Sequence, residues 1–220
     1  MAFHFPSPLY PIVDPVGVPG RAHVELAEAV VAAGIRLFQL RVKQQPTGVF
    51  VEVARAVKAI ADRGGAQLII NDRADIARLL DAAGVHLGQD DLPPEAARVV
   101  LGPRKVIGWS THNPAQLEAA ARAGVADYLA FGPIFPTQSK ERPDPAQGVA
   151  TLAAVRRLTS RPLVAIGGIS AATVADVLRA GADAVAVIGA IAQAADPCAA
   201  TQALERQVRA ATAPRYRRRS

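Results

Sequence analysis

The segment Gln39-Leu40-Arg41-Val42-Lys43 carries two cations and an amide at the spacing of a strand. Because successive strand residues point to opposite sides, the glutamine, arginine and lysine are predicted to share one side. An arginine fork can bind two phosphate oxygens at once, and a lysine adds a point charge. The segment therefore indicates an anion site, with a structural salt-bridge network as the alternative.

The segment Gly132-Pro-Ile-Phe-Pro-Thr-Gln-Ser-Lys140 follows a short apolar run that is typical of a buried strand. One glycine and two prolines stop strand pairing and helix formation, which predicts a loop of fixed shape. Thr137, Ser139 and Lys140 would then lie together at the carboxyl end of the strand. Two hydroxyls and an ammonium suit a phosphate or diphosphate. The alternative is an ordinary surface loop with a solvated lysine.

Asn71, Asp72 and Asp91 supply hard oxygen ligands after two neighbouring apolar runs. Mg²⁺ is typically held by one or two carboxylates together with waters and substrate phosphate. Taken alone, each aspartate could instead cap the helix that follows it. With the cationic segments on the same face, we favour a magnesium site at Asp72 and Asp91.

Glycines stand where two late apolar runs end, at Gly167-Gly168 and at Gly189. Glycine lets backbone N–H groups approach a phosphate closely at the start of a short helix. His112 suits either a base or a purely positional role, and Cys198 shows no sign of reactivity. Together these segments predict two ligands, a diphosphate held with Mg²⁺ and a separate monophosphate.

Eight apolar runs alternate with helix-like segments, which implies parallel strands joined by right-handed crossovers. The leading fold is a single-domain α/β protein, a (β/α)₈ TIM barrel over residues 1–212, followed by an arginine-rich tail, 213–220, expected to be disordered. A doubly wound sheet is the runner-up, but no glycine-rich dinucleotide turn follows the first run. The predicted strands are 9–13, 37–40, 67–70, 85–87, 105–109, 128–131, 163–166 and 184–188. The predicted helices are 22–33, 47–63, 73–82, 94–101, 114–123, 149–159, 171–180 and 197–211.

The composition excludes several classes of protein. No apolar run reaches ~20 residues, which argues against a membrane protein. The single cysteine and four scattered histidines argue against a disulfide framework and a zinc site. With no secretory signal expected in residues 1–8, we predict a cytoplasmic location. The net charge of +6 falls to +2 without the four arginines of 215–220 (21 basic against 19 acidic residues), so no nucleic-acid partner is expected. A homo-oligomer stays open.

In their order and spacing, the segments resemble thiamine phosphate synthase (the thiamine-phosphate pyrophosphorylase family) from residue 9 to about 193. The resemblance rests on Gln39-Leu-Arg-x-Lys43, Asn71-Asp-Arg73, His86-Leu-Gly-Gln-x-Asp91, Ser110-Thr-His-Asn113, the loop 132–140 and Ile166-Gly-Gly-Ile169. It implies transfer of a pyrimidinylmethyl group from an aminopyrimidine diphosphate to thiazole phosphate, with Mg²⁺ and with small molecules as the partners.

The resemblance also implies a division of the site. The aminopyrimidine diphosphate would contact Tyr10, Gln39, Leu40, Arg41, Val42, Lys43, Asn71, Ser110 and Lys140. The thiazole phosphate would contact Thr137, Gln138, Ser139, Gly168, Ile188 and Gly189. Arg41, Lys43, Lys140 and Ser110 would be catalytic, and Asp72 and Asp91 would hold the metal.

Three positions depart from the family pattern. Val42 stands where Glu is frequent, Ser139 replaces a common Thr, and Gly189 replaces a common Ser, which removes one hydroxyl contact to the thiazole phosphate. Two other functions stay open: a thiazole tautomerase of the related branch using His112, and a non-catalytic phosphate-ligand regulator on the same barrel.

Overall fold

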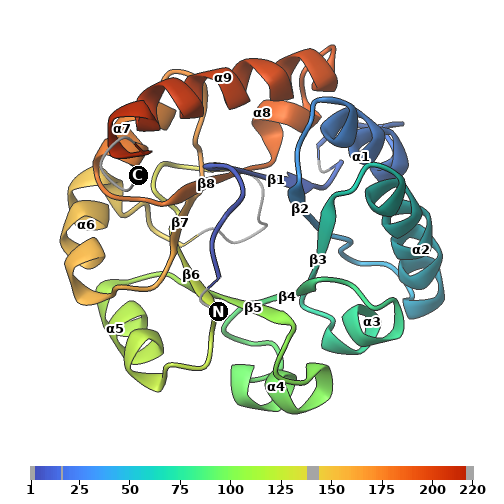
Figure 1. Cartoon of the computed structure of the whole chain (residues 1–220), viewed down its shortest axis with the longest axis horizontal. Helices are drawn as coiled ribbons and strands as arrows, with labels where there is room; N and C mark the ends of the chain where they lie inside the picture. Colours follow the sequence, from blue (N-terminus) through green and yellow to red (C-terminus); the bar gives the residue numbers. More distant parts are fainter. Residues whose placement is uncertain (1–2, 16, 138–143, 217–220) are drawn as a thin grey trace.

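The computed structural model describes residues 3–15, 17–137 and 144–216. Its strands form a closed barrel in which each strand pairs in parallel with its neighbours along the sequence and β8 closes on β1 (Figure 1). The TIM-barrel prediction is confirmed. The strands are β1 (Leu9–Val13), β2 (Leu37–Leu40), β3 (Gln67–Asn71), β4 (Gly84–Leu87), β5 (Val106–Thr111), β6 (Tyr128–Phe131), β7 (Leu163–Ile166) and β8 (Ala184–Val187).

Helices form an outer ring around the barrel, with the long last helix lying across the top of the view in Figure 1. They are α1 (His23–Ala32), α2 (Thr47–Arg63), α3 (Ala74–Leu79), α4 (Pro94–Leu101), α5 (Pro114–Ala123), α6 (Gly148–Val155), α7 (Val174–Arg179), α8 (Gly189–Ala192) and α9 (Pro197–Tyr216). The predicted bounds of α2, α4 and α5 match. The predicted helix 149–159 divides into α6 and a 3₁₀ turn at Arg156–Leu158. The last helix was predicted to end at 211 but continues to Tyr216. The division into residues 1–212 and a tail stays a prediction.

Two apolar clusters follow from the alternation of side chains along the strands. On β2, Phe38 and Leu40 point outward into the large cluster between barrel and helices. Leu37 points inward and joins a smaller cluster that fills the barrel interior. Inward residues of β1 to β3 and of β6 to β8 thus fill the barrel as a packed core rather than a pore.

The amino end of the barrel is closed by the segment before β1. Phe3 and Phe5 stack edge-to-face, with ring centroids 4.8 Å apart. Phe5 packs on Tyr10 and Tyr128 at 5.5 and 5.1 Å. Apolar side chains therefore seal this end, and ligands have access from the carboxyl ends of the strands.

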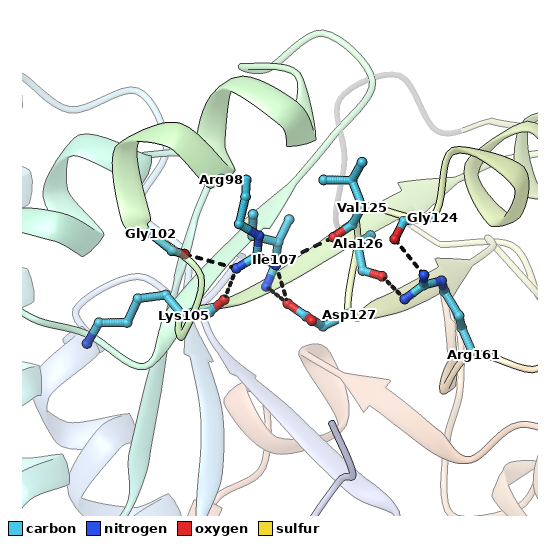
Figure 2. A network of polar contacts seen from close by, with 9 residues as sticks. All are labelled: Arg98, Gly102, Lys105, Ile107, Gly124, Val125, Ala126, Asp127 and Arg161. Atoms are coloured by element: carbon cyan, nitrogen blue, oxygen red, sulfur yellow. Dashed lines mark hydrogen bonds and ion pairs between the residues drawn. The ribbon is translucent and has the colours of Figure 1, made fainter. Parts of the chain in front are cut away.

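An arginine network lies between α4 and the start of β6 (Figure 2). Arg98 donates to the carbonyls of Gly102 and Lys105 and to Asp127 Oδ2 at 2.7 Å. The same Asp127 oxygen accepts the backbone N–H of Ile107, the second residue of β5, at 2.8 Å. One arginine therefore ties the end of a helix to the entries of two strands.

The arrangement recurs two strands further along. Asp183, just before β8, accepts from Arg156 at 2.6 Å and from the backbone N–H of Leu163 in β7 at 2.9 Å. Between the two networks, Arg161 donates to the carbonyls of Gly124 and Ala126 (Figure 2). Residues at this end of a barrel commonly serve stability rather than chemistry.

Candidate active site

A cavity of about 600 Å³ opens at the carboxyl ends of the strands. It receives residues from nearly every strand or the loop after it, as the sequence predicts for a barrel mouth. Eight of the predicted site residues line it: Gln39, Arg41, Asn71, Ser110, Thr137, Gly168, Ile188 and Gly189. The loop after β6 and the turns after β7 and β8 form one wall. Gln138, Ser139 and Lys140 lie outside the described residues.

The loop after β6 is anchored along its described part. Ile134 and Phe135 donate backbone hydrogen bonds to the carbonyls of Ile166 and Gly167 at 2.8 and 3.0 Å. The Gly132–Pro133 peptide is cis. At Gly168, φ is +63° and a Cβ would lie 2.5 Å from a carbonyl oxygen of this loop, so only glycine fits. The backbone after β6 and the backbone after β7 are therefore packed directly together.

The cationic segment divides its side chains as the alternation predicts. Arg41 lines the cavity and forms an ion pair with Asp14, which orients the guanidinium. Lys43 is more exposed and pairs with Asp72. Leu40 and Val42 are buried in the outer core, so any ligand contact from them would involve the backbone. The segment thus presents positive charge to one side of the mouth.

Asp72 and Asp91 come together beside this segment. Burial raises the pKa of Asp91, and a hydrogen bond to Asp72 and the negative charge of Asp72 raise it further. Neither aspartate caps a helix: Arg73 and Pro93 stand at the helix starts, and Asp91 Oδ2 accepts the N–H of Gly88 at 2.7 Å. Two adjacent carboxylates with excess negative charge suit a divalent cation.

The carboxylate pair is a small ligand set. Within residues 3–15, 17–137 and 144–216, no cluster of three or more His, Cys, Asp or Glu side chains is placed to hold a metal ion. A site of two carboxylates matches Mg²⁺, which keeps several waters and takes substrate phosphate as a ligand, better than it matches zinc. Magnesium binding itself stays a prediction.

A series of hydrogen bonds crosses the barrel interior beneath the cavity. Gln39 Nε2 donates to Tyr10 Oη at 3.2 Å, and Tyr10 Oη lies 3.0 Å from Tyr128 Oη. Tyr128 Oη lies 2.9 Å from His86 Nδ1, and His86 Nε2 lies 2.8 Å from Ser110 Oγ. We call these five residues the buried relay. Its two ends, Gln39 and Ser110, both line the cavity.

Burial shapes the relay. Tyr10 and Tyr128 are 1% and 0% exposed, and this burial raises the pKa of both hydroxyls, so both stay protonated. A Cβ at Gly108 would lie 2.1 Å from the Tyr128 ring and 2.5 Å from His86 Nδ1, so glycine leaves the space that the relay occupies. Tyr10, predicted near the pyrimidine, does not line the cavity and lies behind Gln39.

His112 lies in the cavity wall and is held by both backbone and side-chain contacts. Its Nδ1 is 2.9 Å from the carbonyl oxygen of Gly132, and its backbone N–H donates to Gln116 Oε1. Asn113 caps α5 by accepting the N–H of Gln116 at 2.9 Å. These contacts, with Asp144 Oδ2 3.5 Å from Nδ1, hold the ring at the junction of β5 and the β6 loop, and the choice between a base and a positional role stays a prediction.

The sequence from residue 9 to residue 191 matches the model of the family described as "Thiamine monophosphate synthase". The chain belongs to this family. A thiamine-phosphate synthase of Koribacter versatilis (strain Ellin345) is 52% identical over 162 residues, covering 74% of this chain and 76% of the relative. That of Xanthobacter autotrophicus (strain ATCC BAA-1158 / Py2) is 47% identical over 207 residues, covering 94% and 98%.

A solved structure gives the same picture. The thiamine phosphate pyrophosphorylase of Pyrococcus furiosus superposes with a TM-score of 0.81 at 32% identity, covering 92% of this chain and 96% of that one. Family, relatives and structure agree that this chain is an enzyme with thiamine-phosphate synthase activity, a transferase. They give no support to the regulator or tautomerase alternatives. No helix in the described ranges is long and apolar enough to span a membrane.

The residues that line the cavity and to which the sequence assigns no role include His86 and Gln193. His86 sits mid-strand on the inward side of β4, where an ionisable residue in an apolar run was the available signal. Gln193 directly follows α8 and reaches back toward Gly189, where a Cβ would lie 3.4 Å from its amide. Nothing in the sequence marks that contact, because the turn of α8 creates it.

Proposed function

We propose that this chain joins 4-amino-2-methyl-5-(diphosphooxymethyl)pyrimidine to thiazole phosphate and releases diphosphate by a dissociative substitution. One observation carries this assignment of the site. The cavity is lined by Arg41 on one side and by Thr137, Gly168 and Gly189 on another, while the Asp72–Asp91 pair lies outside its lining, directly after the lining residue Asn71 and paired with Lys43. Two phosphorylated ligands of different charge match this division.

The charged side suits the aminopyrimidine diphosphate. Arg41 is oriented by Asp14, and Asn71 lines the same region of the mouth. Lys43 reaches Asp72, so it lies next to the expected metal position. Gln39 and Ser110 would contact the pyrimidine ring, with Tyr10 behind them. The resemblance adds Lys140 as a further cation, together with backbone contacts at Leu40 and Val42.

Magnesium fits the carboxylate pair. Asp72 and Asp91 would hold it, and a bound Mg²⁺ would supply positive charge to the diphosphate oxygens. Asp72 adopts φ +64°, a left-handed conformation that aspartate tolerates better than most residues. This conformation directs the chain away from β3 just where the side chain meets Lys43 and Asp91.

The side of backbone donors suits the monophosphate of the thiazole. Gly168, Ile188 and Gly189 bring backbone N–H groups to the cavity from the turns after β7 and β8. Thr137 adds a hydroxyl from the loop after β6. The family resemblance extends this set to Gln138 and Ser139. Backbone donors at such turns commonly bind phosphate in barrels of this kind.

The chemistry then requires charge stabilisation more than acid–base catalysis. When the bond from the methylene carbon to the diphosphate oxygen breaks, negative charge grows on the departing diphosphate. Arg41, Lys43 and Lys140 would stabilise that charge, as preorganised groups do in a transition state. The electron-rich aminopyrimidine carries the positive charge until the thiazole nitrogen attacks. No protein nucleophile is needed in this sequence of steps.

Turnover with both purified substrates tests the reaction, and a crosswise comparison tests the division of the site. Lys140→Ala and Arg41→Gln should each lower single-turnover rates by about 10²–10³ while thiazole phosphate affinity changes little. Arg122→Gln, an exposed pair partner on α5, is the matched control. If thiazole affinity collapses while single-turnover chemistry stays fast, the two phosphates are assigned to the wrong sides.

A further inference from the structure

We propose that the buried relay fixes one hydrogen-bond acceptor and one donor at the cavity, so that the site selects a ring with an exocyclic amine over the same ring with a carbonyl. This inference rests on the proposed function, because it concerns how the pyrimidine substrate is recognised. Gln39 and Ser110 contact the ligand, whereas Tyr10, Tyr128 and His86 act through them as positioning residues.

The direction of the relay follows from counting protons. Gln39 Nε2 donates to Tyr10 Oη, so the Tyr10 hydroxyl is free to donate onward to Tyr128 Oη. The single proton of Tyr128 then goes to His86 Nδ1. A neutral imidazole that accepts at Nδ1 carries its proton on Nε2, which therefore donates to Ser110 Oγ. The hydroxyl proton of Ser110 is left to point at a ligand.

The opposite direction leaves a buried donor without an acceptor. If Ser110 donated to His86 and His86 to Tyr128, then Tyr128 would donate to Tyr10. Tyr10 Oη would then receive two protons, from Tyr128 and from Gln39, and its own proton would have no acceptor. Among the described residues, these two are the partners of Tyr10 Oη. The structure turns Nε2, not Oε1, of Gln39 toward Tyr10 Oη, and with that amide orientation the opposite direction would leave a buried hydroxyl unsatisfied, a cost that favours the first direction.

The two ends of the relay therefore present a fixed pattern. Gln39 uses its nitrogen within the relay, which leaves Oε1 as the amide atom that can accept from a ligand. Ser110 offers a proton. An aminopyrimidine supplies an amine donor and ring-nitrogen acceptors, which complement both ends. A carbonyl in place of the amine sets acceptor against acceptor at Gln39 Oε1 and leaves only the second Nε2–H as a donor to it, and a site built to accept from an amine rejects an analogue that leaves its polar groups unpaired.

Removal of the Tyr128 hydroxyl should allow the donor and acceptor groups at Gln39 and Ser110 to exchange. In Tyr128→Phe the Tyr10 proton loses its acceptor, and an amide rotation of Gln39 would restore one. His86 Nδ1 loses its donor at the same time, so the imidazole can move its proton to Nδ1 and accept from Ser110. Each end of the relay can then present the opposite group to a ligand.

The first measurement uses the wild-type protein and needs no substrate. Nitrogen-15 NMR of labelled histidine, with His86→Gln to assign the signal, reports which ring nitrogen carries the proton. We expect His86 to be the Nε2–H tautomer. A dominant Nδ1–H tautomer, or a doubly protonated ring at neutral pH, would overturn the proposal. Turnover of the amino substrate with thiazole phosphate, measured in parallel, shows separately whether the proposed function holds.

The second measurement is selectivity. Competition between the aminopyrimidine diphosphate and its 4-oxo analogue should favour the amine by about 10² or more in the wild type. Tyr128→Phe should reduce that ratio about tenfold or more. Ile69→Val, which removes a methyl group beside Gln39 in the same interior cluster but no hydrogen-bonding group, should leave the ratio unchanged. An unchanged ratio in Tyr128→Phe, or an equal fall in Ile69→Val, contradicts the proposal.

Discussion

At the scale of single residues, Asp91 and Asp72 lie together although their charges repel, and the pKa of Asp91 is raised by burial and by Asp72. The nearby Lys43 ammonium, which pairs with Asp72, lowers the pKa of Asp91 but does not offset these effects. A metal cation between the two carboxylates would remove their repulsion. Metal binding would therefore explain why the two aspartates lie so close together, whereas a purely structural role would not.

Asp91→Asn should therefore weaken Mg²⁺ dependence without unfolding the protein. The amide oxygen can still accept from the Gly88 N–H, and the repulsion with Asp72 is lost. We expect Mg²⁺ affinity to fall at least about tenfold, the minimum loss typical for groups that support a metal. Thermal unfolding in a chelator should be unchanged or higher. Activity with unaltered metal dependence would show that Asp91 is not a ligand.

Gly189 offers a test by addition. A Cβ there would meet only the mobile end of Gln193, at 3.4 Å, and φ is not in the left-handed region. Gly189→Ser should thus fold and place a hydroxyl beside the predicted thiazole phosphate. One added hydrogen bond of about 1 kcal/mol corresponds to roughly fivefold tighter thiazole phosphate binding. Gly189→Ala is the control, and the KM for the pyrimidine should not move in either variant.

His23 provides a pH dependence of stability. Its Nε2 lies 3.0 Å from the Arg41 carbonyl oxygen, and burial lowers its pKa, while the contact with Arg41 and the charge of Asp14 oppose this shift. The unfolded chain therefore binds more protons in the window from about pH 6.5 down to the lowered pKa. Stability falls as the pH falls through that window.

His23→Gln keeps a possible donor to the Arg41 carbonyl and cannot titrate. The free energy of unfolding of this variant, measured by urea titration at several pH values, should decline less than that of the wild type below about pH 6.5. Above that window the two curves should run parallel. His4→Gln, the same substitution at an exposed position, is the control. Parallel curves throughout would show that the His23 pKa is not lowered on folding.

At the scale of elements, the two networks around Asp127 and Asp183 hold the amino ends of strands in place. Each aspartate precedes a strand and accepts from the backbone of the strand before it and from an arginine. The side chain thereby sets the spacing at which the two strands enter the barrel. These hydrogen bonds at the amino ends of the strands thus help to position the same strands whose carboxyl ends surround the cavity.

Arg98→Met should reduce stability and leave the chemistry intact. The change removes the partner of half-buried Asp127 and the donors to the Gly102 and Lys105 carbonyls. A loss of about 2 kcal/mol in the free energy of unfolding is expected, with kcat unchanged at 25 °C. Arg122→Met, whose pair with Glu118 is exposed, should cost less than about 0.5 kcal/mol. Equal losses in the two variants would contradict this role for the network.

At the scale of the whole molecule, the barrel has one sealed end and one open end. Phe3 and Phe5 cover the interior from below, and the cavity opens above the buried relay. Between the two, Tyr10 and Tyr128 belong to the buried relay and also pack against Phe5 of the apolar seal. The two tyrosines therefore take part both in the apolar packing at the amino end and in the hydrogen bonds that lie beneath the cavity.

Phe5→Ala should lower the free energy of unfolding by about 2 kcal/mol, because a half-buried ring and its contacts with Tyr10 and Tyr128 are lost. Calorimetry should show a lower Tm, while KM for both substrates stays near the wild-type value at 20 °C. His4→Ala, at the exposed neighbouring position, should have little effect. A large change in KM with an unchanged Tm would mean that the amino-terminal segment acts on the site instead.

Local sequence determined the alternation of strands and helices and the face on which the polar residues gather. Period-two and helical patterns act over a few residues, and parallel strands can only place their carboxyl ends together. The phosphate-type segments, the pairing of Asp72 with Asp91 near Lys43, and the outward direction of Val42 follow from that rule. The bounds of β1, β2, β6 and β7 agree with the sequence patterns to the residue.

Only the tertiary structure decided how side chains distant along the chain meet. Tyr10 and Tyr128 are separated by 118 positions, and His86 and Ser110 by 24, so no local pattern marks the buried relay. Hydrogen bonds of this kind depend on strand register and barrel closure, which set which inward side chains share a layer. The same applies to the Arg98 network, where one helix end meets two strand entries. Chain geometry over a few residues fixes elements, whereas contacts between elements exist only once the barrel has closed.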